Sequence, residues 1–182
     1  MTTVDAAYEK WLRTALDRYE GSLIRYAARI TGDLEQARDV VQDTFLRLCK
    51  AERARLEDHV GEWLFTVCRN RALDVVRKER RMSQLTEAQE TQVASRDPSP
   101  SAVAERRETT GRVVRQLETL SNNQQEVIRL RFQNGMSYKE ISRITGHSVS
   151  NVGFLIHTAV KNLRQRLLTE SDLVQEAGGS LS

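Results

Sequence analysis

The stretch SYKEISRITGHSVSNVGFLIHTAVKNLRQR, residues 137–166, contains two helical patterns separated by a glycine. Ser137 and Glu140 stand three residues apart, which is the spacing of a capping box at the start of a helix. Gly146 permits a tight turn, and Ser148 to Ser150 then open a second helix. A helix, a short glycine turn and a second helix with one polar face predict a helix-turn-helix, whose second helix enters a major groove.

The second helix of this stretch has an apolar side and a polar side when each residue is turned by about 100°. The expected core side consists of Val152, Leu155, Ile156, Ala159, Val160 and Leu163, and the opposite side consists of Phe154, His157, Thr158 and Lys161. A phenyl ring on a solvated face leaves apolar surface in water, which is unfavourable. Because an apolar side chain can pack on a thymine methyl group, the outward position of Phe154 is consistent with base readout.

A plain helical hairpin would need the same glycine and the same apolar stripe, so it is the structural alternative to DNA binding. Residues 128–168 hold seven basic residues and one acidic residue. Small polar side chains stand at the helix entrance, where phosphate or base contacts would form. Together with Lys161 on the polar face, these features favour DNA as the ligand.

The rest of the chain predicts an all-α fold of two small helical domains joined by a flexible linker. A length of 182 residues with 39% hydrophobic residues allows modest cores, and no stretch shows the sustained alternation of a strand. The two prolines, Pro98 and Pro100, lie in a segment short of large apolar residues. We expect a first domain over 1–82, a linker over 83–108, a helix-turn-helix domain over 109–168 and a mobile C-terminal tail over 169–182.

Composition also excludes several classes of protein. Cys49 and Cys68 fall at inward-facing helical positions, which predicts buried free thiols, and the three histidines are scattered, which argues against a metal site. No apolar run approaches the roughly 18 residues of a membrane span, and the N-terminus lacks a secretory signal pattern, so we expect a cytoplasmic protein. No phosphate loop or catalytic constellation is recognisable, and we expect neither enzymatic activity nor a cofactor.

The first domain should begin with a helix from about Tyr8 to Ile30, followed by a second helix with Asp33 as its N-cap. The inward side of the second helix consists of Val41, Thr44, Phe45 and Leu48, and the outward side consists of Asp39, Gln42, Asp43 and Leu46. Two interpretations fit an outward leucine among polar residues. One is a solvated face with a stray leucine, and the other is an acidic docking surface for a large partner.

The third helix, GEWLFTVCRNRALDVVRKERR, repeats this pattern with the opposite charge. Its core stripe is Leu64, Phe65, Cys68, Ala72, Val75 and Val76, whereas Asn70, Asp74, Arg77 and Arg81 emerge on the other side. Six basic and three acidic residues occupy 62–82. Taken alone, this surplus is only weak support for a nucleic-acid ligand, because a basic cluster at a helix C-terminus also complements the helix dipole.

The segments GDLEQARDVVQDTFLRL, WLFTVCRNRALDVVRKERR and LSNNQQEVIRLRFQNGMSYKEISRITGHSVSNVGFLIHTAVKNLRQRL, in this order, resemble a bacterial sigma factor of the extracytoplasmic-function group in the sigma-70 family. The resemblance covers nearly the whole chain apart from the linker, the first few residues and the tail. It implies a two-domain protein that binds core RNA polymerase and directs it to promoters, while catalysis stays with the polymerase.

The resemblance also implies roles for particular residues. Docking on the clamp helices of the largest polymerase subunit falls to Asp39, Gln42, Asp43 and Leu46, with the polymerase flap as a further contact. The −10 element falls to Asn70, Asp74, Arg77, Lys78, Arg80 and Arg81, together with the loop around Leu56 to Gly61. The −35 element falls to Ser148, Ser150, Asn151, Gly153, Phe154, His157, Thr158 and Lys161. An anti-sigma protein, which holds many relatives, is a further expected class of partner.

The recognition helix departs from the common pattern of the family. Members often carry basic residues at the positions of Gly153, Leu155 and Thr158, and this chain has none there. We expect fewer phosphate and guanine contacts and more dependence on DNA shape and on Arg164 and Arg166. Glycine costs a helix about 1 kcal/mol relative to alanine, and a close approach of the helix backbone to DNA is our hypothesis for the compensation.

A different class of function also fits the helix-turn-helix. A conventional transcriptional regulator would pair this motif with a first domain that senses a ligand or forms a dimer. Such a domain would need a pocket or a self-complementary face, whereas the first domain here offers an acidic outer face and a basic one. A regulator should bind a palindrome as a dimer without polymerase, and a sigma factor should require the polymerase.

Overall fold

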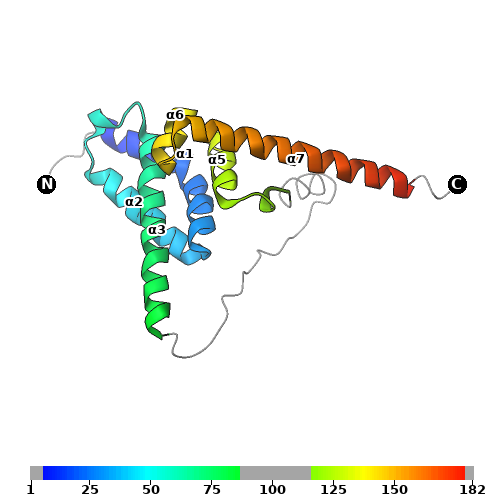
Figure 1. Cartoon of the computed structure of the whole chain (residues 1–182). Coiled ribbons are helices and arrows are strands. Elements are labelled where there is room, and N and C mark those ends of the chain that lie inside the picture. The colour runs from blue at the N-terminus through cyan, green and yellow to red at the C-terminus, as the bar shows by residue number, and fades with distance from the viewer. Residues whose placement is uncertain (1–5, 87–115, 179–182) are drawn as a thin grey trace. The chain divides into compact units, whose positions relative to one another are not determined.

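The computed structural model describes residues 6–86 and 116–178, with side chains described to residue 82 in the first range and to residue 168 in the second. Within these ranges every regular element is a helix, which confirms the all-α prediction. The elements are α1 (Ala6–Thr31), α2 (Leu34–Lys50), the short 3-10 helix η1 (Arg53–Arg55), α3 (Val60–Thr86), α5 (Asn122–Phe132), α6 (Tyr138–Thr145) and α7 (Val149–Gly178) (Figure 1). The first of two compact units holds α1, α2, η1 and α3, and the second holds α5, α7 and most of α6.

The first unit is a three-helix body in which α1, α2 and α3 pack against one another. Leu23, Leu64 and Phe65 are fully buried, and burying a side chain of this size contributes about 1.5–3 kcal/mol. The rings of Tyr26 and Phe65 meet edge to face with their centroids 5.2 Å apart, an arrangement that aromatic pairs prefer. This core holds α2 and α3 side by side and leaves one side of each helix exposed.

The start of α2 is fixed by a side-chain cap. The Asp33 side chain accepts a hydrogen bond from the backbone N–H of Gln36 at 2.8 Å, which confirms the predicted N-cap. The cap satisfies one of the free N–H groups of the first turn. It therefore sets where α2 begins and which of its residues face outward.

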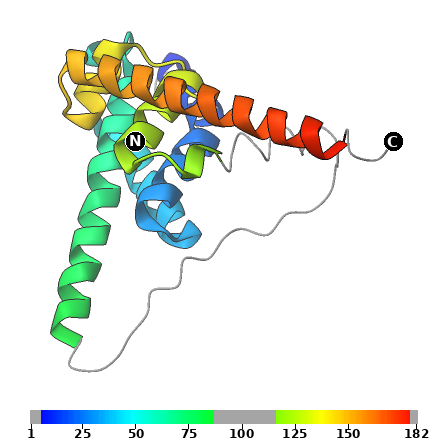
Figure 2. The ribbon, with the colours of Figure 1, turned by 45° about the vertical axis from the view of Figure 1, so that its right-hand side comes forward.

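The second unit contains the predicted helix-turn-helix. A capping box opens α6 at Ser137 with Glu140, as the spacing predicts, and the structure shows a second one that opens α5 at Ser121 with Gln124. Gly146 follows α6 with φ of +77°, in the left-handed region that glycine occupies without steric cost. Helix α5 packs against α7 (Figure 2). The shared core includes Leu117, Val127, Leu130, Met136, Ile141, Val152, Ile156 and Ala159.

Some sequence-based expectations differ from the structure. Val160 is 37% exposed rather than buried. The domain boundaries stay predictions: α3 ends at Thr86, four residues beyond the proposed boundary at 82, and α7 ends at Gly178, within the segment 169–182 expected as a tail. Five of the ten residues of 169–178 are good helix formers, namely two Glu, one Leu, one Gln and one Ala, and a helix that has already nucleated adds residues at less cost than a new one. Most of the expected linker lies outside the described residues.

The two thiols have opposite environments. Cys68 is buried as predicted, and burial raises its pKa to about 12 against a smaller lowering effect of a hydrogen bond with Thr44. Cys49 is exposed, so the prediction of a second buried thiol is wrong. It lies near the C-terminal end of α2, at the edge of a groove rather than in the core. Among the described helices, none is both long and apolar enough to cross a bilayer.

Candidate nucleic-acid and protein interfaces

The outward side of α2 is an exposed ridge, which we call the α2 stripe and define as Asp39, Gln42, Asp43 and Leu46. Asp39, Gln42 and Leu46 are exposed, and the Leu46 side chain is 54% accessible. On the opposite side of the same helix Ala37, Val40, Val41, Thr44 and Leu48 are buried. Because the fold leaves a leucine uncovered beside two polar side chains, the stripe has the mixed chemistry of a protein-docking surface.

Two grooves flank the α2 stripe. Gln42 and Leu46 border a groove between α1 and α2, whose other walls include Leu16, Ile24 and Phe45. Asp39 borders a second groove between α2 and α3, with Val75, Lys78 and Met82 among its other lining residues. The stripe is therefore a ridge with an apolar recess on one side and a mixed recess on the other. A partner that binds the α2 stripe can therefore contact both recesses.

Asp43 differs from the other members of the stripe because two arginines hold it. Its Oδ2 atom accepts hydrogen bonds from Arg71 Nε at 2.6 Å and from Arg47 Nε at 3.0 Å. Burial raises the pKa of the Asp43 carboxyl, but the hydrogen bonds and charges of Arg71 and Arg47 outweigh it and leave the pKa below its ordinary value. Arg71 lies on α3, so this carboxylate ties α2 to α3. Sequence reasoning missed Arg71, because only tertiary packing brings it to Asp43.

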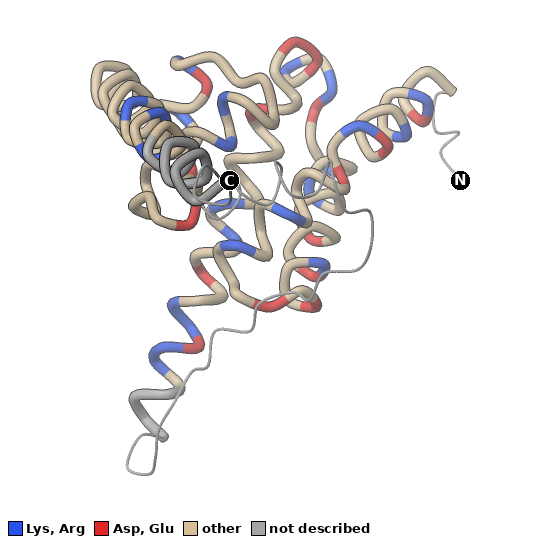
Figure 3. The backbone as a smooth tube through the Cα atoms, turned by 90° about the vertical axis from the view of Figure 1, so that its right-hand side faces the viewer, with Lys and Arg blue, Asp and Glu red and all other residues tan. Residues whose placement is uncertain are grey.

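The outward side of α3 carries the basic surplus of the first unit, and Figure 3 shows Lys and Arg recurring along its C-terminal half. The proposed −10 residues Asn70, Asp74, Arg77, Lys78, Arg80 and Arg81 are all exposed. Asp74 Oδ1 and Arg77 Nη1 lie 3.4 Å apart in a solvent-exposed pair, which contributes little to stability. These side chains therefore make no strong intramolecular interaction among the described residues and can contact phosphates.

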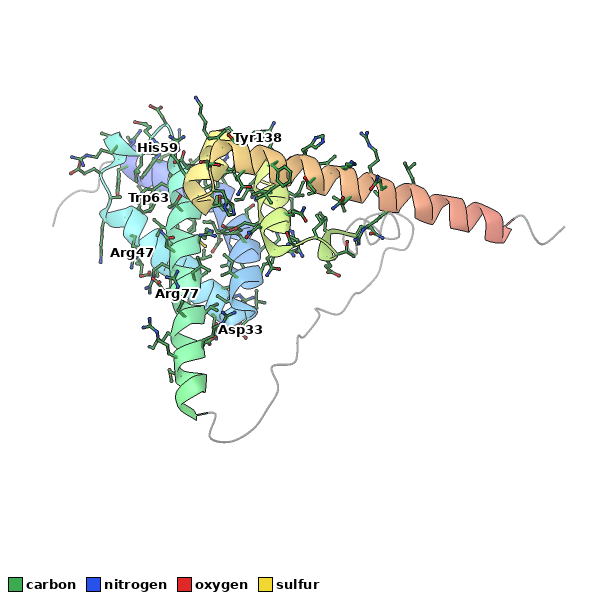
Figure 4. All side chains as sticks on the ribbon, viewed as in Figure 1. Asp33, Arg47, His59, Trp63, Arg77 and Tyr138 are labelled. Carbon is green, nitrogen blue, oxygen red and sulfur yellow. The ribbon has the colours of Figure 1, made fainter. Side chains whose placement is uncertain are left out.

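An aromatic ring stands on the same side of α3 as Asn70. Trp63 precedes Asn70 by two helical turns, and its side chain is half-buried. Figure 4 shows Trp63 near the start of α3 and Arg77 further along the helix. An indole and an amide on one helix face suit contact with unstacked bases, for which aromatic side chains serve as stacking platforms.

The loop before α3 does not offer all of its residues to a ligand. Leu56 is only 6% exposed and anchors the loop to the first unit, so it is unavailable for base contact. Glu57, Asp58 and His59 are exposed instead. Base capture around Leu56 to Gly61 would therefore fall to polar groups of this loop.

The outward side of α7 carries the residues expected at the −35 element. Ser148, Ser150, Asn151, Phe154, His157 and Lys161 are exposed, and Gly153 and Thr158 are half-buried at the edges of this face. The Ser148 hydroxyl already accepts a hydrogen bond from the N–H of Asn151 at 3.2 Å, so it caps the helix as well. Lys161 is the single lysine or arginine among these eight residues.

Tyr138, at the first position of α6, is a neighbour of this face that sequence reasoning missed. A Cβ atom placed on Gly153 would lie 3.6 Å from the Tyr138 ring, so the ring lies against the bare backbone of α7. The Arg131 guanidinium stacks on the same ring at 5.6 Å from its centroid (Figure 4 labels Tyr138). The available signal was its place directly after the Ser137 cap.

Comparison with known proteins identifies the family. Residues 15–82 match Sigma-70 region 2, and residues 110–163 match Sigma-70, region 4. The ECF RNA polymerase sigma factor SigL of Mycobacterium tuberculosis is 32% identical over 169 residues, which cover 89% of this chain and 92% of the relative. The RNA polymerase sigma factor YlaC of Bacillus subtilis is 26% identical, with 82% of this chain and 88% of the relative covered.

A solved structure supports the fold. The sigma factor RpoE of Bartonella quintana, crystallised with the anti-sigma factor NepR, superposes with a TM-score of 0.62 at 22% identity, over 90% of this chain and 98% of RpoE. The two matched regions occur in the sigma-70 order, and the SigL match spans nearly the full length of both chains. This chain therefore belongs to the extracytoplasmic-function sigma factors of the sigma-70 family, which bind core RNA polymerase and direct it to promoters for the start of transcription.

Proposed function

We propose a division of labour between the two units. The α2 stripe docks on the clamp helices of the largest polymerase subunit, the outward side of α3 contacts the −10 element, and the outward side of α7 contacts the −35 element. In this assignment residues 1–82 form the docking and melting domain and residues 109–168 form the upstream-binding domain. Residues 83–108 then span the distance between them.

The observation that carries the docking assignment is the exposure of Leu46, which follows Gln42 by one helical turn and Asp39 by two on the same side of α2. A solvated helix needs no leucine at this position, whereas a protein partner gains by covering it. One buried leucine is worth about 1.5–3 kcal/mol, and the flanking acidic and amide groups set the orientation of the partner. The α2 stripe thus has an energetic reason to be an interface.

The promoter assignment draws on charge and position. The α3 face presents Arg77, Lys78, Arg80 and Arg81 to phosphates, and Trp63 and Asn70 to bases that have left the duplex. Holding such bases in contact with aromatic and polar groups offsets the loss of stacking and so favours melting. We propose that this chain itself makes and breaks no covalent bond and that it works in the cytoplasm beside the polymerase.

An anti-sigma protein is a second proposed partner of the same surfaces. The fold match to a sigma factor that was crystallised with its anti-sigma factor supports this class of partner. The apolar recess beside Leu46 is a surface that such an inhibitor would have to cover to block polymerase docking. Competition between core polymerase and the inhibitor for this chain would follow.

Reconstitution with core polymerase tests the docking assignment. Asp39→Lys should weaken binding of the purified chain to core polymerase by at least about tenfold, because like charges in an interface cost several kcal/mol and about 1.4 kcal/mol corresponds to tenfold. Leu46→Ala should act in the same direction through lost apolar contact. Binding is measured by fluorescence anisotropy without DNA, and initiation is measured by run-off transcription.

A matched control distinguishes a local from a general charge effect. Lys10 is exposed on α1 rather than on α2, and Lys10→Glu changes the net charge by two units, as Asp39→Lys does, but in the opposite direction, so a general charge effect would strengthen binding. Lys10→Glu should leave the affinity for core polymerase unchanged. Equal affinity of Asp39→Lys, Leu46→Ala and the native chain would remove the docking assignment.

A further inference from the structure

The outward side of α7 that carries the eight proposed −35 residues, which we call the reading face, presents one large apolar side chain, Phe154. The Phe154 ring is 66% exposed near the centre of this face, and the side chains of Tyr138 and Val149 are 39% and 44% exposed close to the start of the same helix. Among the described residues of the second unit, none covers most of the Phe154 ring. A large apolar side chain left open at the middle of a proposed DNA-binding face needs a ligand group of matching chemistry.

Gly153 is a second, independent observation at the same place. Its φ is not in the left-handed region, so its backbone conformation does not require glycine. Packing does not require it either, because an added Cβ would meet Tyr138 at 3.6 and 3.9 Å, which are ordinary contact distances. Within the described part of the second unit, neither conformation nor packing therefore requires glycine at 153, and glycine weakens a helix. Glycine is the residue that allows a ligand to approach a backbone closely.

From these two observations we infer that the upstream element is read through thymine methyl groups. Phe154 packs on the methyl group of a thymine in the major groove, and Gly153 lets the DNA come close enough for this contact. This inference rests on the assignment of α7 to the −35 element. It deepens that assignment, because it names thymine rather than guanine as the base class that this helix selects.

The chemistry of the face supports thymine over guanine. Guanine is read by arginine or lysine through its O6 and N7 acceptors, whereas the methyl group of thymine is the apolar feature of the major groove and accepts contact with phenylalanine. Lys161 is the one basic side chain among the eight proposed −35 residues, and it lies two turns beyond Phe154. None of the proposed −35 residues around Gly153 and Phe154 can therefore read guanine in this way, whereas Phe154 can contact a methyl group. The neighbouring Arg131 guanidinium stacks on the Tyr138 ring and donates a hydrogen bond to the backbone carbonyl of Met136.

Deoxyuridine substitution tests this contact directly. Holoenzyme reconstituted from the full chain selects promoter fragments from random DNA, and protection experiments locate the upstream element. Each thymine of that element is then replaced singly by deoxyuridine, which pairs identically but lacks the methyl group. We expect one or two thymines whose replacement weakens holoenzyme binding about fourfold, the effect of one buried methyl-sized group.

Variants of the chain connect the effect to this site. Phe154→Ser should bind thymine and deoxyuridine fragments equally. Phe132→Ser is the matched control, because the Phe132 ring on α5 is 65% exposed but does not lie on α7; it should keep the native discrimination. Gly153→Ala should raise the midpoint of thermal unfolding and yet weaken promoter binding, a pair of opposite effects that a purely structural role would not produce.

Three outcomes would overturn the inference. If every thymine of a protected upstream element tolerates deoxyuridine, thymine reading is wrong while the −35 assignment stands. If Phe154→Ser lowers the unfolding midpoint by several degrees or weakens binding to core polymerase without DNA, the ring contacts protein instead. If no upstream element is protected at all, the assignment of α7 to the promoter fails, and the inference falls with it.

Discussion

The sides of α3 and α7 that we propose to face the promoter differ in the means by which each can hold DNA. The α3 side carries four basic residues within the five of RKERR, all exposed, whereas the reading face of α7 has Lys161 alone among eight residues. A charged face binds any phosphate backbone and is sensitive to salt. A face with one charge and an exposed phenyl ring binds weakly unless the bases fit. The first unit is thus suited to binding the DNA backbone without regard to sequence, and the second is suited to selecting a base sequence.

The largest expected effect comes from removing the charge of α3. Replacing Arg77, Lys78, Arg80 and Arg81 together with Ala should make the dependence of promoter affinity on salt less steep by about three to four logarithmic units per unit of log salt, because each lost phosphate contact removes about 0.7–0.9. Affinity of the holoenzyme is measured across a salt series. Since the four side chains are exposed, the unfolding midpoint should barely move. An unchanged slope would show that α3 does not hold the backbone.

A smaller effect is expected on α7. Lys161→Ala should reduce the same salt slope by about one, because a single phosphate contact is lost. It should weaken binding to thymine and deoxyuridine fragments by the same factor. If Lys161→Ala changed the salt slope as much as the quadruple α3 variant does, the proposed contrast between nonspecific backbone binding by the first unit and base selection by the second would be wrong.

The smallest expected effect concerns how α3 is held in place. Asp43→Asn removes the charge that ties Arg71 on α3 to α2, and we expect it to lower the free energy of unfolding by about 1 kcal/mol or less, because all three side chains are partly exposed. The pKa of the Asp43 carboxyl lies below its ordinary value of 3.8. Its contribution is therefore present above about pH 4 and is lost as the pH falls through the lowered pKa.

Urea unfolding between pH 7 and pH 3 measures this contribution. The difference between Asp43→Asn and the native chain should shrink below about pH 4. Glu35→Gln is the control, because Glu35 pairs with Arg38 within the same helix and ties no second helix to α2; it should have a smaller effect. A pH-independent difference would mean that the amide fails for a reason other than charge.

Local signals in the sequence predicted the helices well. Asp33, the Ser137 and Glu140 box, and Gly146 each act through bonds within a few residues, so their effects can be read from spacing alone. Cys49 and Val160 were assigned to the core from helical periodicity and are exposed. Periodicity gives the direction of a side chain, but not how far the neighbouring helix extends to cover it.

The site was predictable in outline for the same reason. The exposed sides of α2, α3 and α7 follow from periodicity, since each lies opposite a buried stripe. The contacts of Asp43 with Arg71 and of Tyr138 with Gly153 join residues of different helices and depend on how those helices pack. The sequence carries no short-range sign of either contact. The residues that hold the candidate surfaces in position, such as Arg71 and Tyr138, were therefore harder to predict from the sequence than the residues that line those surfaces.

The contrast between the two cysteines has a practical consequence. Cys68 is sealed in the core with its proton held to about pH 12, so it presents almost no thiolate to a maleimide in the folded chain. Cys49 is open to solvent and borders the recess beside Leu46. A maleimide dye added to the chain of native sequence would label Cys49, and the emission of the dye would report polymerase binding in real time.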